Sequence, residues 1–150
     1  MNEHEYYMSV ALSLAQEAGE AGEAPVGCVV ADVYGAIIGR GRNRRENDKN
    51  ALAHAELEAI EDACKTLNGW RLNGCSLYVT LEPCPMCAGA AIMSRLDKVV
   101  YGARDELTGS CGSVINLFME PYGCSTKIVG GVLADECSGL MSDFFKNLRI

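Results

Sequence analysis

The chain lacks long apolar runs, and none approaches the length of a membrane span. Its longest stretches, such as 26–31 and 129–134, are far shorter than the roughly 20 residues of a transmembrane helix. No basic segment followed by an apolar run marks a secretory signal, which predicts a cytoplasmic location. Internal repeats, low-complexity tracts and Pro- or Ser-rich linkers are also missing, so the 150 residues predict a single domain spanning 1–150.

Basic residues are scarce, with 13 Lys and Arg against 20 Asp and Glu and a formal net charge of -7. The segment up to Ala24 contains several glutamates and no Lys or Arg. This balance argues against a nucleic-acid partner on bulk charge. One loop-like stretch is nevertheless locally basic, and charge alone leaves it open whether it contacts phosphates or is a solvated loop. Its basic residues are Arg40, Arg42, Arg44, Arg45 and Lys49.

Cysteine, by contrast, is abundant, with eight residues. Because no secretory signal is visible, we expect reduced thiols rather than a disulfide scaffold. Cys28 and Cys75 lie in apolar, strand-like runs and Cys64 lies in a helical pattern, where a free thiol behaves as a small apolar side chain. Cys84 and Cys87 alone have the spacing of paired metal ligands.

Apolar periodicity predicts helices that alternate with strands. Helical spacing marks 3–18, a region from His54 that ends before Asn68-Gly69, 84–95 and 134–147. Apolar or β-rich runs mark strands at 26–31, 36–39, 76–80, 98–101 and 126–129, the first two joined as a hairpin. This order predicts an α/β fold, a three-layer α/β/α sandwich around a mixed, roughly five-stranded sheet.

Two motifs carry metal-binding chemistry, His54-Ala55-Glu56 and Pro83-Cys84-Pro85-Met86-Cys87. Zinc prefers thiolate and imidazole ligands, and a catalytic zinc ion has three protein ligands and a fourth position for water. A Cys-x-x-Cys pair at a helix start brings both sulfurs toward one point, where the positive helix end favours thiolates. No second such pair exists to complete a four-thiolate site. We therefore predict one zinc ion per chain, held by His54, Cys84 and Cys87.

Glu56 is the predicted proton-transfer residue. A neighbouring carboxylate takes a proton from zinc-activated water and later delivers it to the leaving group. Residues two apart do not share a face in mid-helix, so His54 and Glu56 must both lie at a helix start to reach one metal. The two motifs together match the H-x-E…P-C-x-x-C signature of zinc deaminases.

Further segments extend the similarity over nearly the whole chain. They are 24–27 (APVG), 41–44 (GRNR), 53–56 (AHAE), 78–90 (YVTLEPCPMCAGA), 99–105 (VVYGARD), 112–113 (GS), 131–133 (GVL) and 143–145 (DFF). On these residues the chain resembles bacterial tRNA adenosine deaminases of the cytidine deaminase-like superfamily. Two positions depart from that family: 122–125 reads YGCS where an Asn-His pair is common, and Met93 stands where many members have His. We expect both near the RNA or just behind the pocket.

The resemblance implies a zinc-dependent hydrolase that converts adenosine to inosine at the wobble position of a tRNA anticodon, acting as a homodimer. It implies that Asn43 and Val26 hold the flipped adenosine, that Arg104 and Asp105 contact flanking nucleotides, and that Phe145 lies near the RNA. Structural explanations also exist for Asn43 and Asp105 as turn or helix caps and for Phe145 as core.

Two other functions stay open at this point. A deaminase of a free nucleobase, nucleoside or nucleotide, of guanine or cytosine type, would share the same metal site. A non-catalytic module, in which zinc only stabilises the fold, would also need the ligands. Glu56 beside a three-ligand site argues against this last possibility, because a structural zinc needs no vacant position.

Overall fold

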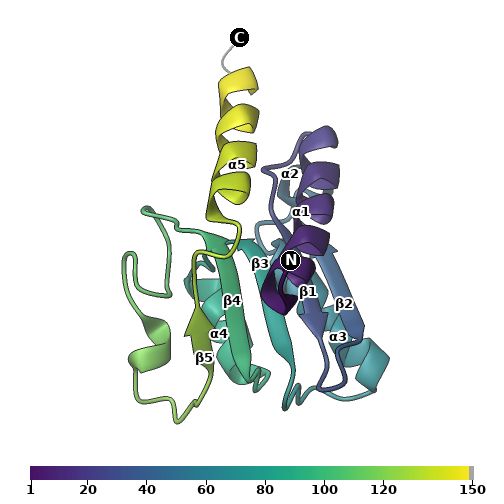
Figure 1. The fold of residues 1–150 in the computed structure, drawn as a ribbon, viewed down its shortest axis with the longest axis vertical. Helices are drawn as coiled ribbons and strands as arrows, with labels where there is room; N and C mark the ends of the chain where they lie inside the picture. Colours follow the sequence, from purple (N-terminus) through teal and green to yellow (C-terminus); the bar gives the residue numbers. More distant parts are fainter. Residues whose placement is uncertain (149–150) are drawn as a thin grey trace.

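A computed structural model describes residues 1–148 and contains one five-stranded sheet (Figure 1). The strand order is β2-β1-β3-β4-β5; β1 is antiparallel to β2 and β3, whereas β3, β4 and β5 are mutually parallel. The predicted α/β fold with a mixed sheet is therefore confirmed. The elements are α1 (Glu3–Glu20), β1 (Gly27–Ala31), β2 (Ile37–Arg42), α2 (Arg45–Asp48), α3 (Ala55–Leu67), β3 (Ser76–Leu81), α4 (Pro85–Met93), β4 (Lys98–Ala103), η1 (Leu117–Met119), β5 (Lys127–Val129) and α5 (Ala134–Leu148).

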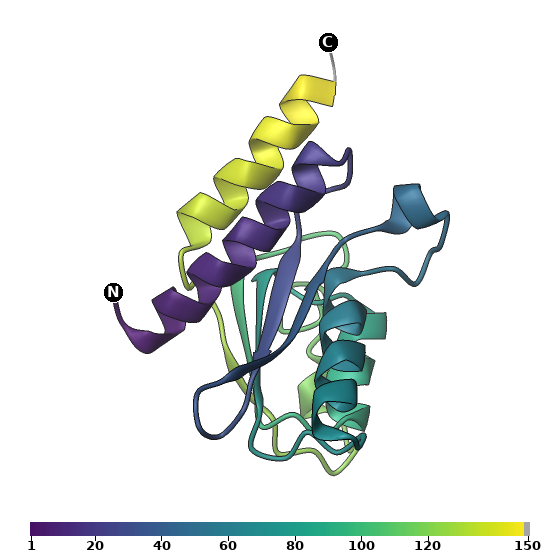
Figure 2. The same cartoon turned by 90° about the vertical axis from the view of Figure 1, so that its right-hand side faces the viewer.

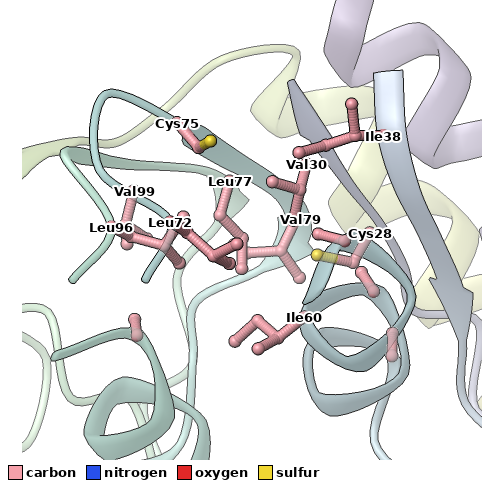
Figure 3. Close-up of a cluster of buried hydrophobic side chains, with 14 of the residues drawn as sticks. Cys28, Val30, Ile38, Ile60, Leu72, Cys75, Leu77, Val79, Leu96 and Val99 are labelled. Carbon is pink, nitrogen blue, oxygen red and sulfur yellow. The ribbon is translucent and has the colours of Figure 1, made fainter. Parts of the chain in front are cut away.

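Helices cover both faces of the sheet, as the three-layer prediction requires. Figure 2 shows α1 and α5, in purple and yellow, together on one side, and α3 and α4, in teal, on the other. Because side chains alternate along a strand, Leu77 and Val79 of β3 pack toward α3 and α4, whereas Tyr78 packs with α1. Figure 3 shows Leu77 and Val79 beside Ile60 of α3 in the first of these two apolar cores.

One edge of the sheet gathers the predicted site residues. Leu81 of β3 pairs with Ala103 of β4, so the residues after these parallel strands emerge side by side. Gly27 at the start of β1 pairs with Arg42 at the end of β2, and Cys28 of β1 pairs with Val79 of β3. The segments around 26, 43, 82–84 and 104–105 therefore share this edge.

The basic stretch is not the loop that the sequence predicts. Arg40 and Arg42 belong to β2, and Arg45–Asp48 forms the short helix α2. Four helical residues are too few to produce an apolar period, so sequence reasoning missed α2 and likewise the three-residue η1. Arg44 is not free either, because its Nε lies 2.6 Å from Oε2 of Glu58 on α3. Within residues 1–148, no helix combines the length and apolarity needed to cross a membrane.

Candidate active site

His54 and Glu56 lie at the start of α3, as predicted. His54 is the N-cap residue, with extended backbone, and Glu56 is the second helical residue. At a helix start successive side chains have not yet separated onto different faces, so both can point toward one centre. Only 4% of Glu56 is exposed, which isolates its carboxylate from bulk water.

Cys84 and Cys87 lie at the start of α4. Cys84 is the N-cap residue and Pro85 occupies the first helical position, where a missing N–H costs nothing. Cys87 follows within the first turn and is 1% exposed. The predicted arrangement of a Cys-x-x-Cys pair at a helix start is therefore present.

The two helix starts bring the three predicted ligands together. Nδ1 of His54 lies 3.6 Å from Sγ of Cys84 and 3.5 Å from Sγ of Cys87. The ligand atoms of all three residues lie within 4.8 Å of one another. Tetrahedral zinc with Zn–N bonds of about 2.0 Å and Zn–S bonds of about 2.3 Å separates N from S by about 3.5 Å. The donor set and its spacing fit a zinc ion.

Contacts among these ligands also set their protonation. The side-chain hydrogen bond from Cys87 is the main cause that lowers the pKa of Cys84 to about 4, and His54 contributes further. The same sulfur–sulfur contact raises the pKa of Cys87. The hydrogen bond with Cys84 raises the pKa of His54. Because metal ligands bind deprotonated, cation binding at this group releases protons.

The pKa of the Glu56 carboxyl group lies near neutral pH. Burial raises its pKa to about 7, and the neighbouring Cys84 adds to the effect. A group that titrates near neutral pH serves well both as proton acceptor and as proton donor. The position and pKa of Glu56 therefore suit a proton shuttle.

A pocket of about 890 Å³ opens onto this centre. His54, Glu56 and Cys84 are among its lining residues. All five predicted substrate-binding residues line it as well, which are Val26, Asn43, Arg104, Asp105 and Phe145. The predicted substrate residues thus line one cavity, although they come from four separate segments.

Asn43, which lines this pocket, has one side-chain atom without a hydrogen-bond partner among the described residues. Its Nδ2 donates to the carbonyl oxygen of Ala24 at 3.4 Å, which ties the end of β2 to the segment before β1. Its Oδ1 is buried and has no partner among the described residues. Buried polar atoms are nearly always paired, so the unpartnered Oδ1 of this pocket-lining residue stands out among the described side chains.

Similarity to known proteins identifies the family of this site. Residues 1–103 match the family model described as the cytidine and deoxycytidylate deaminase zinc-binding region. The chain is 48% identical to the tRNA-specific adenosine deaminase of Bacillus subtilis (strain 168), over 99% of this chain and 92% of that protein. The chain belongs to the tRNA-specific adenosine deaminase family. The family and the enzyme class predicted from the sequence are thereby confirmed for this deaminase.

Solved structures share its fold. A structure from studies of A-to-I editing by tRNA:A34 deaminases at the wobble position of transfer RNA has a TM-score of 0.86 and 37% identity, covering 90% of this chain and 98% of that chain. The guanine deaminase of Nitrosomonas europaea has a TM-score of 0.84 and 25% identity, covering 93% and 83% of the two chains. One fold therefore serves both a tRNA deaminase and a free-base deaminase.

The loop after β4 carries two of the predicted substrate residues of this deaminase. Arg104 is exposed, and its Nε donates to Oγ of Ser113 at 3.1 Å. The Asp105 carboxylate accepts from the backbone N–H groups of Leu107 and Thr108 at 3.0 and 3.3 Å, so it caps a turn. Phe145 on α5 is 44% exposed and is not core.

The two departures from the family do not line this pocket. Met93 and 122–125 are absent from the lining of this pocket. Met93 ends α4, about 12 Å along the helix from its start at the pocket. The segment 122–125 precedes β5, and β5 is parallel to β4, so it lies at the opposite edge of the sheet. Neither position therefore lies just behind this chain's own pocket, and their nearness to the RNA stays a prediction.

Sequence reasoning also missed several lining residues. Leu107, Met141 and Lys146 come from segments with no motif, so only folding brings them to the pocket. Arg45 lines it too, and the sequence had left open whether the basic stretch that contains it contacts phosphates. Glu82 lies inside the segment that carries the family resemblance, directly before Pro83-Cys84. A carboxylate between an apolar strand and a metal-ligand pair was the signal that could have identified it.

Proposed function

We propose that this protein hydrolytically deaminates adenosine to inosine at the wobble position of a tRNA anticodon and releases ammonia. The observation that carries the proposal is the group of His54, Cys84 and Cys87 with the buried Glu56, beside a pocket that is lined by His54, Glu56 and Cys84 and by the residues expected to hold a flipped adenosine. A flipped base must enter such a pocket, and an anticodon loop presents unpaired bases that unstack at low cost.

One zinc ion per chain is part of this proposal, with His54, Cys84 and Cys87 as its ligands. When bound, zinc acts as a Lewis acid that makes water nucleophilic at neutral pH. Glu56 takes a proton from the attacking water as oxygen adds to C6 of the purine. It gives this proton to N1 of the ring and then moves the proton of the new C6 hydroxyl to the amino nitrogen. The C6–N bond breaks, ammonia leaves, and the C6 carbonyl and N1–H of inosine remain.

Two side chains hold the base in the proposed complex. The unpartnered Oδ1 of Asn43 accepts a hydrogen bond from the bound nucleoside, which satisfies this buried atom. Val26 is 8% exposed and provides an apolar wall. These contacts bind substrate and orient it relative to Glu56.

Charge at the pocket favours a nucleic acid over a free base. Among the exposed side chains that line the pocket, three are cationic, Arg45, Arg104 and Lys146, and one is acidic, Glu106, whose Oε1 lies 3.8 Å from Nε of Arg104. Cations thus outnumber acids among these exposed side chains, although the chain carries a net charge of -7. Cations concentrated at one opening of an acidic protein attract the phosphates of a polyanion. A neutral free base gains nothing from them.

We also propose that the protein acts as a homodimer in the cytoplasm. Large apolar side chains outside the pocket are exposed on α4 and along 114–122, and a second copy would cover them. They are Met93 (66%), Val114 (54%), Ile115 (46%), Met119 (82%) and Tyr122 (64%). Sedimentation that shows only monomer at micromolar concentration contradicts this part of the proposal.

Substrate class is tested by measuring ammonia release and inosine formation from an anticodon stem-loop with adenosine at the wobble position. Free adenosine, guanine and cytidine are the comparison substrates. We expect turnover of the stem-loop, and none in the Glu56→Ala variant although it retains stoichiometric zinc. A stem-loop with guanosine at the same position is the matched control and yields no ammonia.

Two results overturn the proposal. Strong activity on guanine or cytidine with none on the stem-loop assigns the free-base function instead. Loss of zinc from Glu56→Ala contradicts the division of roles between ligands and proton shuttle.

A further inference from the structure

Glu82 is a buried carboxylate that the proposed chemistry does not use. It directly follows β3 and precedes the Pro83-Cys84 turn, and 2% of it is exposed. In the described part of the chain, no lysine or arginine forms an ion pair with it. A buried charge without a counterion is costly unless hydrogen bonds replace its water. Its surroundings must therefore supply several donors.

The donors all come from one segment, 105–113. Glu82 accepts from the backbone N–H groups of Asp105 at 3.1 Å, Cys111 at 2.9 Å and Ser113 at 3.1 Å. The hydroxyl of Ser113 donates a fourth hydrogen bond to Oε1. Both carboxylate oxygens are thereby occupied, and a segment without regular secondary structure gains a common anchor.

The segment also packs directly on the carboxylate. A Cβ atom at Gly109 would lie 2.4 Å from Cδ of Glu82, so only glycine fits this close approach. The next residue, Ser110, donates its N–H to the carbonyl oxygen of Pro83 at 2.9 Å. The segment is thus held against the turn that presents Cys84.

A chain of two hydrogen bonds connects Glu82 to Arg104. Nε of Arg104 donates to Oγ of Ser113, and the same hydroxyl donates to Glu82. Since Ser113 directs its proton to the carboxylate, its oxygen is left to accept from Arg104. The exposed guanidinium at the pocket opening therefore has a preferred orientation that originates at a buried residue.

We propose that Glu82 is a positioning residue that shapes the 104–108 wall of the pocket and orients Arg104 through Ser113. It acts on substrate binding and neither holds the metal nor transfers the proton. The part that concerns substrate rests on the proposed function, whereas the part that concerns the wall does not depend on any substrate.

The first experiment measures amide hydrogen exchange in the zinc-loaded protein and in Glu82→Gln. The glutamine keeps the size of the side chain but removes the charge and one acceptor oxygen. We expect exchange at residues 105, 111 and 113 to accelerate about tenfold or more, while β3 and α3 exchange as in the wild type. Glu61→Gln, an exposed carboxylate on α3, is the matched control and leaves all these rates unchanged.

The second experiment compares KM with kcat on the anticodon stem-loop. We expect Glu82→Gln to raise KM about tenfold with kcat changed less than about twofold and zinc content unchanged. Glu82→Asp, which keeps the charge, restores part of the loss. We expect Ser113→Ala and Arg104→Ala each to raise KM. In the double variant the two factors should not multiply, because each substitution removes the same hydrogen bond between Arg104 and Ser113.

Unchanged exchange at 105, 111 and 113 in Glu82→Gln overturns the proposal whatever the substrate is. A variant that loses zinc, or whose exchange accelerates uniformly, overturns it as well, because Glu82 then only maintains the fold. Ser113→Ala removes a single side-chain donor. If its increase in KM and that of Arg104→Ala multiply in the double variant, the connection between Ser113 and Arg104 is refuted. If the wild type is inactive on the stem-loop, the proposed function fails, and the exchange rates still decide the role of Glu82.

Discussion

Tyr78 illustrates at the residue scale how burial fixes a protonation state outside the active site. Its ring lies within the apolar core between the sheet and α1, and its hydroxyl is 2.9 Å from Nδ1 of His4. Burial is the main cause that raises the pKa of Tyr78 to about 12 from the ordinary 10.0. The neutral phenol therefore belongs to the folded state, and its ionisation favours unfolding.

We predict that Tyr78 makes the fold sensitive to alkali. Because the folded pKa is raised, its contribution to the free energy of unfolding is complete below about pH 10 and is lost as the pH rises through about 12. Urea denaturation at a series of pH values should show this loss in the wild type and a smaller loss in Tyr78→Phe. If the free energy of unfolding falls equally with pH in both proteins between about pH 10 and 12, Tyr78 is not the cause of the alkali sensitivity.

At the scale of elements, the contact of α3 with β2 places the catalytic helix start. Gly39 and Gly41 of β2 face α3, where added Cβ atoms would lie 2.2 Å from the carbonyl oxygens of Ala59 and Ala55. Glycine in these strand positions lets the helix backbone approach closely. This short distance between β2 and α3 fixes where His54 and Glu56, at the start of α3, lie relative to the strand ends.

We predict that Gly41→Ala lowers both stability and activity. The new methyl group meets backbone atoms of Ala55 and Ala59, which cannot move without shifting the start of α3. Overpacking of this kind costs about 1–3 kcal/mol of unfolding free energy, and kcat should fall because Glu56 moves with the helix. Thermal unfolding and single-turnover kinetics measure the two effects.

Gly139→Ala is the control for this substitution. Gly139 lies within α5 with no atom within 4 Å of an added Cβ, so alanine should raise the unfolding free energy by about 0.5–1 kcal/mol. If Gly41→Ala behaves like this control, close packing of β2 on α3 does not position the site.

At the scale of the whole molecule, the metal group joins parts that are stable for other reasons. The ligands come from two helix starts, of α3 and α4, that follow different strands. Two apolar cores, one on each face of the sheet, hold these helices and strands together independently of the ligands. The metal therefore connects a framework that already exists.

We predict that removing zinc with a chelator lowers Tm but leaves the protein folded at 25 °C. Binding to the folded state alone adds RT ln(1 + [Zn]/Kd) to the free energy of unfolding, and removal of the metal subtracts only that amount. Far-UV circular dichroism with and without chelator measures both properties, and Cys87→Ser, which lacks a ligand, should not respond. Unfolding at 25 °C on chelation would instead support a purely structural metal.

The sequence determined the chemistry and the order of the elements. Spacing within His54-Ala55-Glu56 and Cys84-x-x-Cys87 defines a ligand set locally, and apolar periodicity records which face of each element is buried. Both signals lie within a few residues, so they can be read without a fold. Short elements such as α2 leave no such period, and this is why they were missed.

Tertiary structure alone decided what surrounds that chemistry. It placed 122–125 and Met93 away from the pocket, added Arg45 and Lys146 to its opening, and closed the loop after β4 around Glu82. These relations join residues far apart in the chain, and they follow from strand order and the direction of parallel strands. Because no local pattern encodes sheet order, the zinc group was predictable from sequence, whereas the walls of its pocket required the fold.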